Sequence, residues 1–97
     1  MYAIVRQGKL KPGMSAEFTA KAEQTAQAMT GKIAGFKAFY IIAGEGDEMC
    51  AVSVYESKAA ADAAQAAVGE QVLAAFAPML ASQPTTLSGA IAVAKTF

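Results

Sequence analysis

The sequence predicts an α+β fold in which two helical regions cover one face of a four-stranded antiparallel sheet. Three observations predict it. The chain has 97 residues, the size of a single hydrophobic core. Its residues are 55% hydrophobic and 16% charged, a composition typical of a folded chain. Short β-rich runs and amphipathic helical segments follow one another in the order βαββαβ. We therefore expect one domain over residues 1–97.

The first half of the pattern is a strand followed by an amphipathic helix. The segment Tyr2–Leu10 is rich in β-forming residues and ends at the turn signal Lys11-Pro12-Gly13. Ser15 is placed to cap a helix, in which apolar side chains recur at helical spacing as far as Ile33. These side chains are Phe18, Ala22, Ala26, Met29 and Ile33. The sequence therefore predicts a helix over 15–33 with one apolar face.

A hairpin follows, with strands at Phe36–Ala43 and Met49–Tyr55 joined by Gly44-Glu45-Gly46-Asp47. A two- or four-residue loop sets Tyr40 opposite Ala51 and Phe36 opposite Tyr55. One face then carries Phe36, Ala38, Tyr40, Ile42, Met49, Ala51, Ser53 and Tyr55. The other carries Lys37, Phe39, Ile41, Cys50, Val52 and Val54. We expect this second set to lie under the helices.

The second helical region is rich in alanine. Ser57 is placed to cap it, and Gly69 is expected to break it into two pieces. Pro78 should kink the later piece or lie near its end, and Gln83-Pro84 should stop it. The apolar stripe of this region is Ala60, Ala61, Ala64, Ala67 and Val68.

Leu87–Lys95 is the last expected strand, because Ile91 and Val93 alternate with small residues. With right-handed crossovers, the complete order of elements gives a ferredoxin-like arrangement.

Both faces of the expected sheet are largely apolar, whereas the helices can cover only one. The face with Phe36, Tyr40 and Tyr55 carries no charge unless Arg6 reaches it, and a solvated face normally alternates apolar with charged residues. We therefore expect a second copy to pack its sheet against this face about a two-fold axis. The alternative is that the C-terminal helical segment, or the loop around Pro84, covers it within one chain.

Charge and residue types argue against several classes of function. Eight Lys and Arg balance eight Asp and Glu, so no net field attracts nucleic acid or an anionic membrane. The chain has no His and a single Cys50, so we expect no metal site and no intrachain disulfide. The N-terminus does not resemble a signal peptide. We expect a cytoplasmic protein with no nucleic-acid or membrane partner.

Three segments carry a resemblance to a known family. They are Gly35-Phe36-Lys37-Ala38-Phe39-Tyr40, Gly44-Glu45-Gly46-Asp47, and Val52-Ser53-Val54-Tyr55-Glu56-Ser57-Lys58-Ala59-Ala60-Ala61-Asp62-Ala63. In this order they resemble the dimeric α/β-barrel superfamily, nearest its antibiotic biosynthesis monooxygenase-like branch. Characterised members of that branch oxidise quinol-type or polyaromatic substrates with O2 and without an added cofactor, while relatives degrade haem or isomerise lactones.

The resemblance implies a homodimer with a small aromatic-binding cavity in each protomer and no cofactor. Haem-degrading relatives need an axial His, usually with Asn and Trp nearby, and this sequence contains none of the three. The haem-degrading branch is therefore excluded.

Arg6 and Tyr40 are the candidates for a chemical role. The guanidinium of Arg6, the one Arg of the chain, could hold a phenolate or carboxylate if it points inward. The alternative is an ion pair, for example with Glu56. Tyr40 and Tyr55 could hydrogen-bond a quinone oxygen while their rings line a pocket, or they could simply pack at a dimer interface.

Two other side chains are given structural roles. Cys50 is expected to be a small buried hydrophobe on the helix side of the hairpin rather than a reactive thiol. Ser53 has no apparent base beside it, so a hydrolytic nucleophile is not expected there.

Two functions fit these observations. The first is a cofactor-independent monooxygenase-like enzyme, in which the electron-rich ring of a small aromatic or quinol substrate meets O2. Arg6 and Tyr40 would stabilise developing phenolate charge, and Phe36, Ser53 and Tyr55 would bind the substrate. The second is a non-catalytic homodimeric binding or assembly protein of the same fold, whose cavity is filled by side chains or holds a hydrophobic ligand. An open, partly polar cavity that touches Arg6 and a Tyr favours the enzyme.

Overall fold

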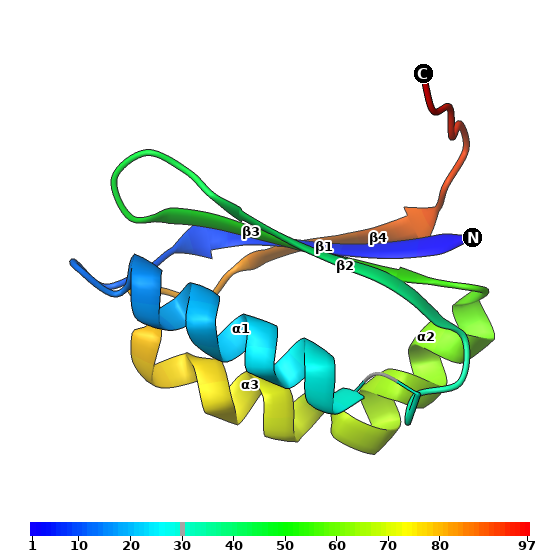
Figure 1. Cartoon of the computed structure of the whole chain (residues 1–97), viewed down its shortest axis with the longest axis horizontal. Coiled ribbons are helices and arrows are strands. Elements are labelled where there is room, and N and C mark those ends of the chain that lie inside the picture. Colours follow the sequence, from blue (N-terminus) through cyan, green and yellow to red (C-terminus); the bar gives the residue numbers. More distant parts are fainter. Residues whose placement is uncertain (30) are drawn as a thin grey trace.

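Four strands form one sheet, and the helices all lie on one side of it (Figure 1). The computed structural model describes residues 1–29 and 31–97. Its elements are β1 (Tyr2–Lys9), α1 (Ser15–Met29), β2 (Phe36–Ala43), β3 (Glu48–Tyr55), α2 (Lys58–Ala64), α3 (Glu70–Phe76) and β4 (Thr85–Ala90). A π-helical turn, Gln65–Gly69, joins α2 to α3, and a 3₁₀ turn, Ala77–Met79, follows α3.

The strand order is β2-β3-β1-β4, and every neighbouring pair is antiparallel. This is the ferredoxin-like βαββαβ arrangement, so the fold predicted from the order of elements is confirmed. None of the helices in residues 1–29 and 31–97 is long and apolar enough to cross a membrane.

The first helix is shorter than predicted. It ends at Met29 rather than near Ile33, and position 30 of the expected helix lies outside the described residues. Gly31 has a φ of 76°, a left-handed conformation that cannot continue a right-handed helix. The N–H of Lys32 instead donates to the carbonyl of Met29 at 3.0 Å and closes a turn.

The second helical region is continuous through Gly69, contrary to the expected break. Backbone angles stay right-handed helical on both sides of the π-helical turn, at Gln65 and Glu70. Pro78 lies in the 3₁₀ turn at the end of the region, as expected, and the region stops before Gln83-Pro84. A π-helical turn accommodates one extra residue without ending the helix, which is how the chain passes this point.

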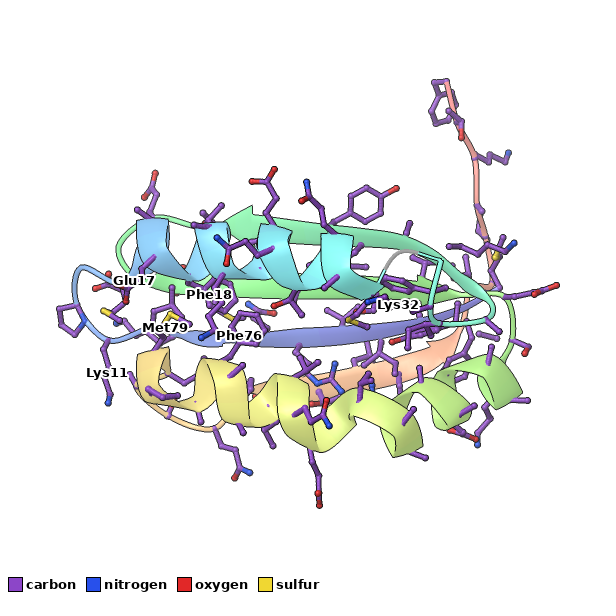
Figure 2. The ribbon with its side chains drawn as sticks, turned by 60° about the horizontal axis from the view of Figure 1, so that its bottom comes forward. Lys11, Glu17, Phe18, Lys32, Phe76 and Met79 are labelled. Carbon is purple, nitrogen blue, oxygen red and sulfur yellow. The ribbon has the colours of Figure 1, made fainter. Side chains whose placement is uncertain are left out.

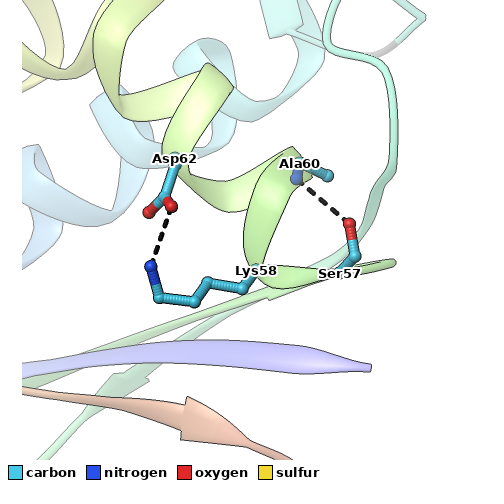
Figure 3. A network of polar contacts seen from close by, with 4 residues as sticks. All are labelled: Ser57, Lys58, Ala60 and Asp62. Atoms are coloured by element: carbon cyan, nitrogen blue, oxygen red, sulfur yellow. Dashed lines mark hydrogen bonds and ion pairs between the residues drawn. The ribbon is translucent and has the colours of Figure 1, made fainter.

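Ser57 caps α2, as predicted. Its hydroxyl oxygen accepts a hydrogen bond from the N–H of Ala60 at 3.1 Å (Figure 3). In the next turn the Nζ of Lys58 donates to Asp62 at 2.9 Å, and this bond together with the negative charge of Asp62 raises the pKa of Lys58. Both side chains are exposed, so the pair contributes little to stability.

The last strand ends earlier than predicted, at Ala90 instead of Lys95. The physical reason is the length of its partner, β1: Ala90 pairs with Tyr2, and the N–H of Ile91 then donates to the carbonyl of Met1 at 2.9 Å. In the described residues the pairing of β4 with β1 ends at this bond. Residues 92–97 leave the sheet on the side away from the helices (Figure 1).

The register of the hairpin differs from the prediction because β2 contains an irregularity at Lys37. Phe36 pairs with Tyr55, as predicted, but Tyr40 pairs with Val52 instead of Ala51. One extra residue therefore lies between Phe36 and Ala38, as in a β-bulge. The shift changes which residues of the two strands share a face.

The helix face of the sheet, the one under the helices, differs from the expected set. Met49, Ser53 and Tyr55 are buried, and Met49 and Tyr55 belong to clusters that include helix residues. The helix face includes Tyr2, Ile4, Arg6, Phe36, Phe39, Ile41, Met49, Ala51, Ser53 and Tyr55. The open face, on the other side, includes Val5, Tyr40, Ile42, Cys50, Val52, Val54 and Leu87. The assignment of β3 is thus reversed, and Phe36 of β2 also lies under the helices instead of on the uncovered face where it was expected. Cys50 is half-buried on the open face instead of lying under the helices.

The helices rest on the sheet through two separate hydrophobic clusters. One consists of Ile4, Tyr55, Ala61 and Ala64. The other consists of Leu10, Phe18, Met49 and Met79. At the second cluster the rings of Phe18 and Phe76 lie 5.2 Å apart and close the space between α1 and α3 (Figure 2). Arg6 lies on β1 between Ile4 of the first cluster and Leu10 of the second.

The approach of Gly35 to α2 gives a test of this packing. Gly35 has a φ of 79°, and a Cβ on it would lie 2.7 Å from the Cβ of Ala60. We expect Gly35→Ala to lower the free energy of unfolding by about 2 kcal/mol or more, because the new methyl group adds a clash to the conformational strain. Unfolding in urea measures this loss in the free energy of unfolding. Gly31→Ala is the control, since its φ is similar at 76° but its Cβ would meet nothing within 4 Å. Equal losses in the two variants would contradict the proximity of Gly35 and Ala60.

Candidate functional site

A cavity of about 340 Å³ lies between the sheet and the helices. Its sheet wall consists of Arg6, Phe36, Phe39, Ala51, Ser53 and Tyr55. Its helix wall includes Met29, Gln65, Val68, Leu73 and Phe76. The small side chains of Ala51 and Ser53, near the middle of the helix face, leave this space unfilled between the two clusters.

The aromatic part of the wall depends on the irregularity at Lys37. Phe36 and Phe39 are three positions apart and would lie on opposite faces of a regular strand. The extra residue brings both rings to the helix face, 6.3 Å apart, and the ring of Phe36 also lies 5.4 Å from that of Tyr55. Three aromatic rings therefore line one side of the cavity.

Arg6 brings the main polar group into this largely apolar space. Its Nη2 donates to the Oε1 of Gln65 at 3.1 Å, which links β1 to the π-helical turn across the cavity. The ion pair with Glu56 that we considered is not formed: within the described ranges, the pair Lys58–Asp62 is the one ion pair. Glu70 also lines the cavity. The partner of the part-buried guanidinium is thus a neutral amide.

The π-helical turn and its glycine make room for that amide. Gly69 also lines the cavity, and a Cβ on it would lie 3.0 Å from the Oε1 of Gln65. This contact is tighter than side chains normally tolerate. The absence of a side chain at Gly69 therefore allows the amide of Gln65 to occupy the position in which it accepts from Arg6.

Four of the five residues expected at the site line the cavity. They are Arg6, Phe36, Ser53 and Tyr55. Ser53 and Tyr55 are buried, with 7% and 3% of their surface exposed. Tyr40, the expected catalytic partner of Arg6, is instead 59% exposed on the open face and does not line the cavity. The reason is the shifted register, which separates Tyr40 from Ser53 and Tyr55.

Sequence reasoning missed Phe39, Gln65 and Gly69. Phe39 was assigned to the helix side, but the shift that places it beside Phe36 leaves no pattern in the sequence. Gln65 did leave a signal, because it is a polar residue four positions after Ala61 and three before Val68, on the apolar stripe of the helix. Over residues 1–29 and 31–97, no three His, Cys, Asp or Glu side chains gather closely enough to hold a metal ion.

Comparison with known proteins agrees with this architecture. The family model of the antibiotic biosynthesis monooxygenases matches residues 1–78. No curated protein matches the chain significantly.

Several solved structures share the fold. A Nitrosomonas europaea protein of unknown function is 20% identical with a TM-score of 0.77, over 98% of this chain and 92% of that one. A Deinococcus radiodurans protein assigned to the antibiotic biosynthesis monooxygenases is 12% identical with a TM-score of 0.81, over 100% and 98% of the two chains. A Streptomyces coelicolor monooxygenase, solved in complex with nanaomycin D, is 17% identical with a TM-score of 0.74, over 98% and 90%.

At these identities the structural likeness shows the fold, whereas the family model matches most of the chain. Members of the matched family typically form dimers. The chain belongs to the antibiotic biosynthesis monooxygenase family and has the fold of the dimeric α/β-barrel superfamily.

Proposed function

We propose that the protein is a cofactor-independent monooxygenase-like enzyme that binds a small aromatic or quinol in the cavity between sheet and helices. The observation that carries the proposal is the cavity itself: about 340 Å³, largely apolar, with Arg6 on its wall and only an amide as the partner of that cation. Its volume lies in the range of small-molecule sites. The complex of the Streptomyces coelicolor relative with nanaomycin D supports an aromatic ligand.

The cavity walls suit the chemistry of a phenol or quinol. The rings of Phe36, Phe39 and Tyr55 can pack against a flat substrate. The guanidinium of Arg6 can bond a substrate oxygen and favour its deprotonated form, because a nearby cation lowers the pKa of a phenol. A phenolate is a better electron donor than a phenol. Arg6 would therefore promote the reaction by stabilising negative charge on the substrate.

The oxidation needs no electron source other than the substrate. Conversion of a phenol to a quinone takes up one O2 and releases one H2O: one oxygen atom enters the ring and the other leaves as water. The protein would bind and orient the ring, stabilise the phenolate and limit access of water. Tyr40 is not retained as a partner in this step, because its side chain lies on the other face of the sheet.

The alternative is a binding protein of the same fold without catalysis. It is favoured by the lack of any His, which leaves no imidazole to accept the substrate proton near neutral pH. In the proposed enzyme, deprotonation of the substrate depends on the acidity of the substrate itself and on the charge of Arg6. Ligand binding without turnover would support the alternative.

We also infer that two copies associate through their open faces. Tyr40, Ile42 and Leu87 are exposed there although they are large and apolar, and no helix in residues 1–29 and 31–97 covers them (Figure 1). The sequence prediction of two apolar faces holds although the residues assigned to each face changed. Residues 92–97 extend on the same side, where Val93 and Phe97 are exposed. A second copy would bury these side chains.

Oxygen consumption tests the enzymatic proposal. With a panel of hydroquinones and hydroxynaphthalenes, we expect uptake above the rate in buffer, and Arg6→Gln should lower that rate about a hundredfold or more. This substitution removes the charge while keeping a polar side chain. Lys9→Gln is the matched control, because it removes one positive charge from an exposed position of β1 outside the cavity. Uptake no faster than in buffer, or equal in Arg6→Gln and the native protein, would reject the enzyme.

Sedimentation velocity tests the homodimer. We expect twice the mass of one chain for the native protein and a single chain for Leu87→Glu, because a charge at this exposed apolar position costs nothing in one protomer but is buried in the dimer. Ala74→Glu, at an exposed position of α3, should remain dimeric. A native protein with the mass of one chain at micromolar concentration would contradict the proposed interface.

A further inference from the structure

The guanidinium of Arg6 is held as a cation without a compensating anion. In the part of the chain described, its one hydrogen-bond acceptor is the Oε1 of Gln65, at 3.1 Å. A guanidinium has five N–H donors, and the remaining ones bond no described protein group. A part-buried arginine is more commonly paired with a carboxylate. Here the cation keeps both its charge and free donors at the wall of a cavity.

The other groups that line the cavity do not neutralise the positive charge of Arg6. Glu70 is its one anionic residue, but it is exposed and forms no ion pair with Arg6 in the described structure. The hydroxyl of Thr25 donates to the carbonyl of Lys21 at 2.8 Å and is thus engaged in its own helix. Ser53 is neutral. The site therefore has a positive end at Arg6 and an aromatic wall beside it.

The position of Gln65 follows from the π-helical turn. Gln65 opens that turn, and its N–H is shared between the carbonyls of Ala61 and Asp62, as expected where one helical spacing changes to another. Gly69, at the end of the turn, lies against the amide and leaves it room. Neither the π-helical turn nor the glycine is needed to continue the helix, and an alanine at position 69 would stabilise the helix more than glycine does. Both features place an acceptor in front of Arg6.

We propose that Gln65 is a positioning residue, which orients Arg6 without neutralising it. The cavity then selects ligands that carry an anionic oxygen, a phenolate or a carboxylate, over neutral ligands of the same shape. The inference rests on the proposed binding of a small aromatic in this cavity, and it adds the charge of the ligand and the residue that maintains the selectivity. A carboxylate at position 65 would occupy the free donors of Arg6 and cancel its charge.

A pair of ligands matched in shape tests the selectivity. Naphthalene-2-carboxylate and naphthalene-2-carboxamide differ in charge and little in size, and calorimetry at neutral pH measures the binding of each. We expect the native protein to bind the carboxylate about tenfold or more tightly than the amide, because its bond to Arg6 is charge-assisted. Gln65→Glu should abolish this preference. Gln27→Glu, the same change at an exposed position of α1 outside the cavity, should retain it.

A spectroscopic probe separates positioning from a merely structural role. The phenolate and phenol forms of 4-nitrophenol absorb differently, so the pKa of the bound phenol can be measured directly. Bound beside Arg6 in the native protein, the phenol should have a pKa below its value in solution. Gln65→Glu should bring the pKa of the bound phenol back toward the solution value, while Gln65→Leu, which leaves the cation uncompensated, should keep part of the shift.

Gly69→Ala offers a second route that avoids a new charge. Its Cβ would lie 3.0 Å from the Oε1 of Gln65, so the amide must shift by a few tenths of an ångström away from its place beside Arg6. The preference for the carboxylate ligand should therefore fall while the helix is retained. Circular dichroism of each variant confirms that it is folded.

The outcomes distinguish the anion selectivity proposed here from the binding of an aromatic ligand in the cavity. Equal binding of both naphthalene ligands by the native protein would overturn the anion selectivity and leave the aromatic-binding cavity intact. Binding of neither would overturn both. A preference that is unchanged in Gln65→Glu but lost in Arg6→Gln would overturn the role of Gln65 alone.

Discussion

The helical layer is supported on the sheet at two places, and the space between them determines what this molecule can do. At one end Ile4 and Tyr55 pack against alanines of α2, and at the other Leu10, Phe18, Met49 and Met79 pack together. Between these supports the cavity wall on the helix face includes Ala51 and Ser53, whose side chains are small. A cavity of about 340 Å³ results. Alanine-rich helices suit this design, because their short side chains permit close contact at the supports and add little bulk elsewhere.

One extra residue in β2 connects the fold to the site. At Lys37 the pairing with β3 shifts by one position, so Phe36 and Phe39 both face the helices and Tyr40 faces away. The same shift therefore builds the aromatic wall of the cavity and leaves an aromatic side chain on the open face, where we infer the second protomer. Lys37 is the residue at which a charge is tolerated, because its side chain is exposed. β-bulges are often found beside functional sites for this reason.

The electrostatics of the cavity depend on the hydrogen bond between Arg6 and the neutral amide of Gln65. A hydrogen bond to a neutral amide holds the guanidinium of Arg6 in place and leaves its positive charge available to a ligand. A carboxylate partner would have stabilised the cation more strongly but would have neutralised its charge. In a chain without His, this uncompensated cation is the group in the cavity best able to make a phenol more acidic. The geometry of the cavity and the absence of His thus favour the same chemistry, in which the ring of a deprotonated phenol donates electrons.

Sequence alone was sufficient for the order of the elements, the cap at Ser57 and the hairpin strands. These features depend on local propensity, turn residues and apolar periodicity, and each of the three can be recognised within a short segment of the sequence. The end of β4, the faces of β3, the placement of Tyr40 and Cys50 and the partner of Arg6 were decided only by the tertiary structure. A strand extends only as far as its neighbour, and a single inserted residue reverses every side chain beyond it. A polar partner fifty-nine positions away is chosen by how the layers pack, and no local pattern contains that information.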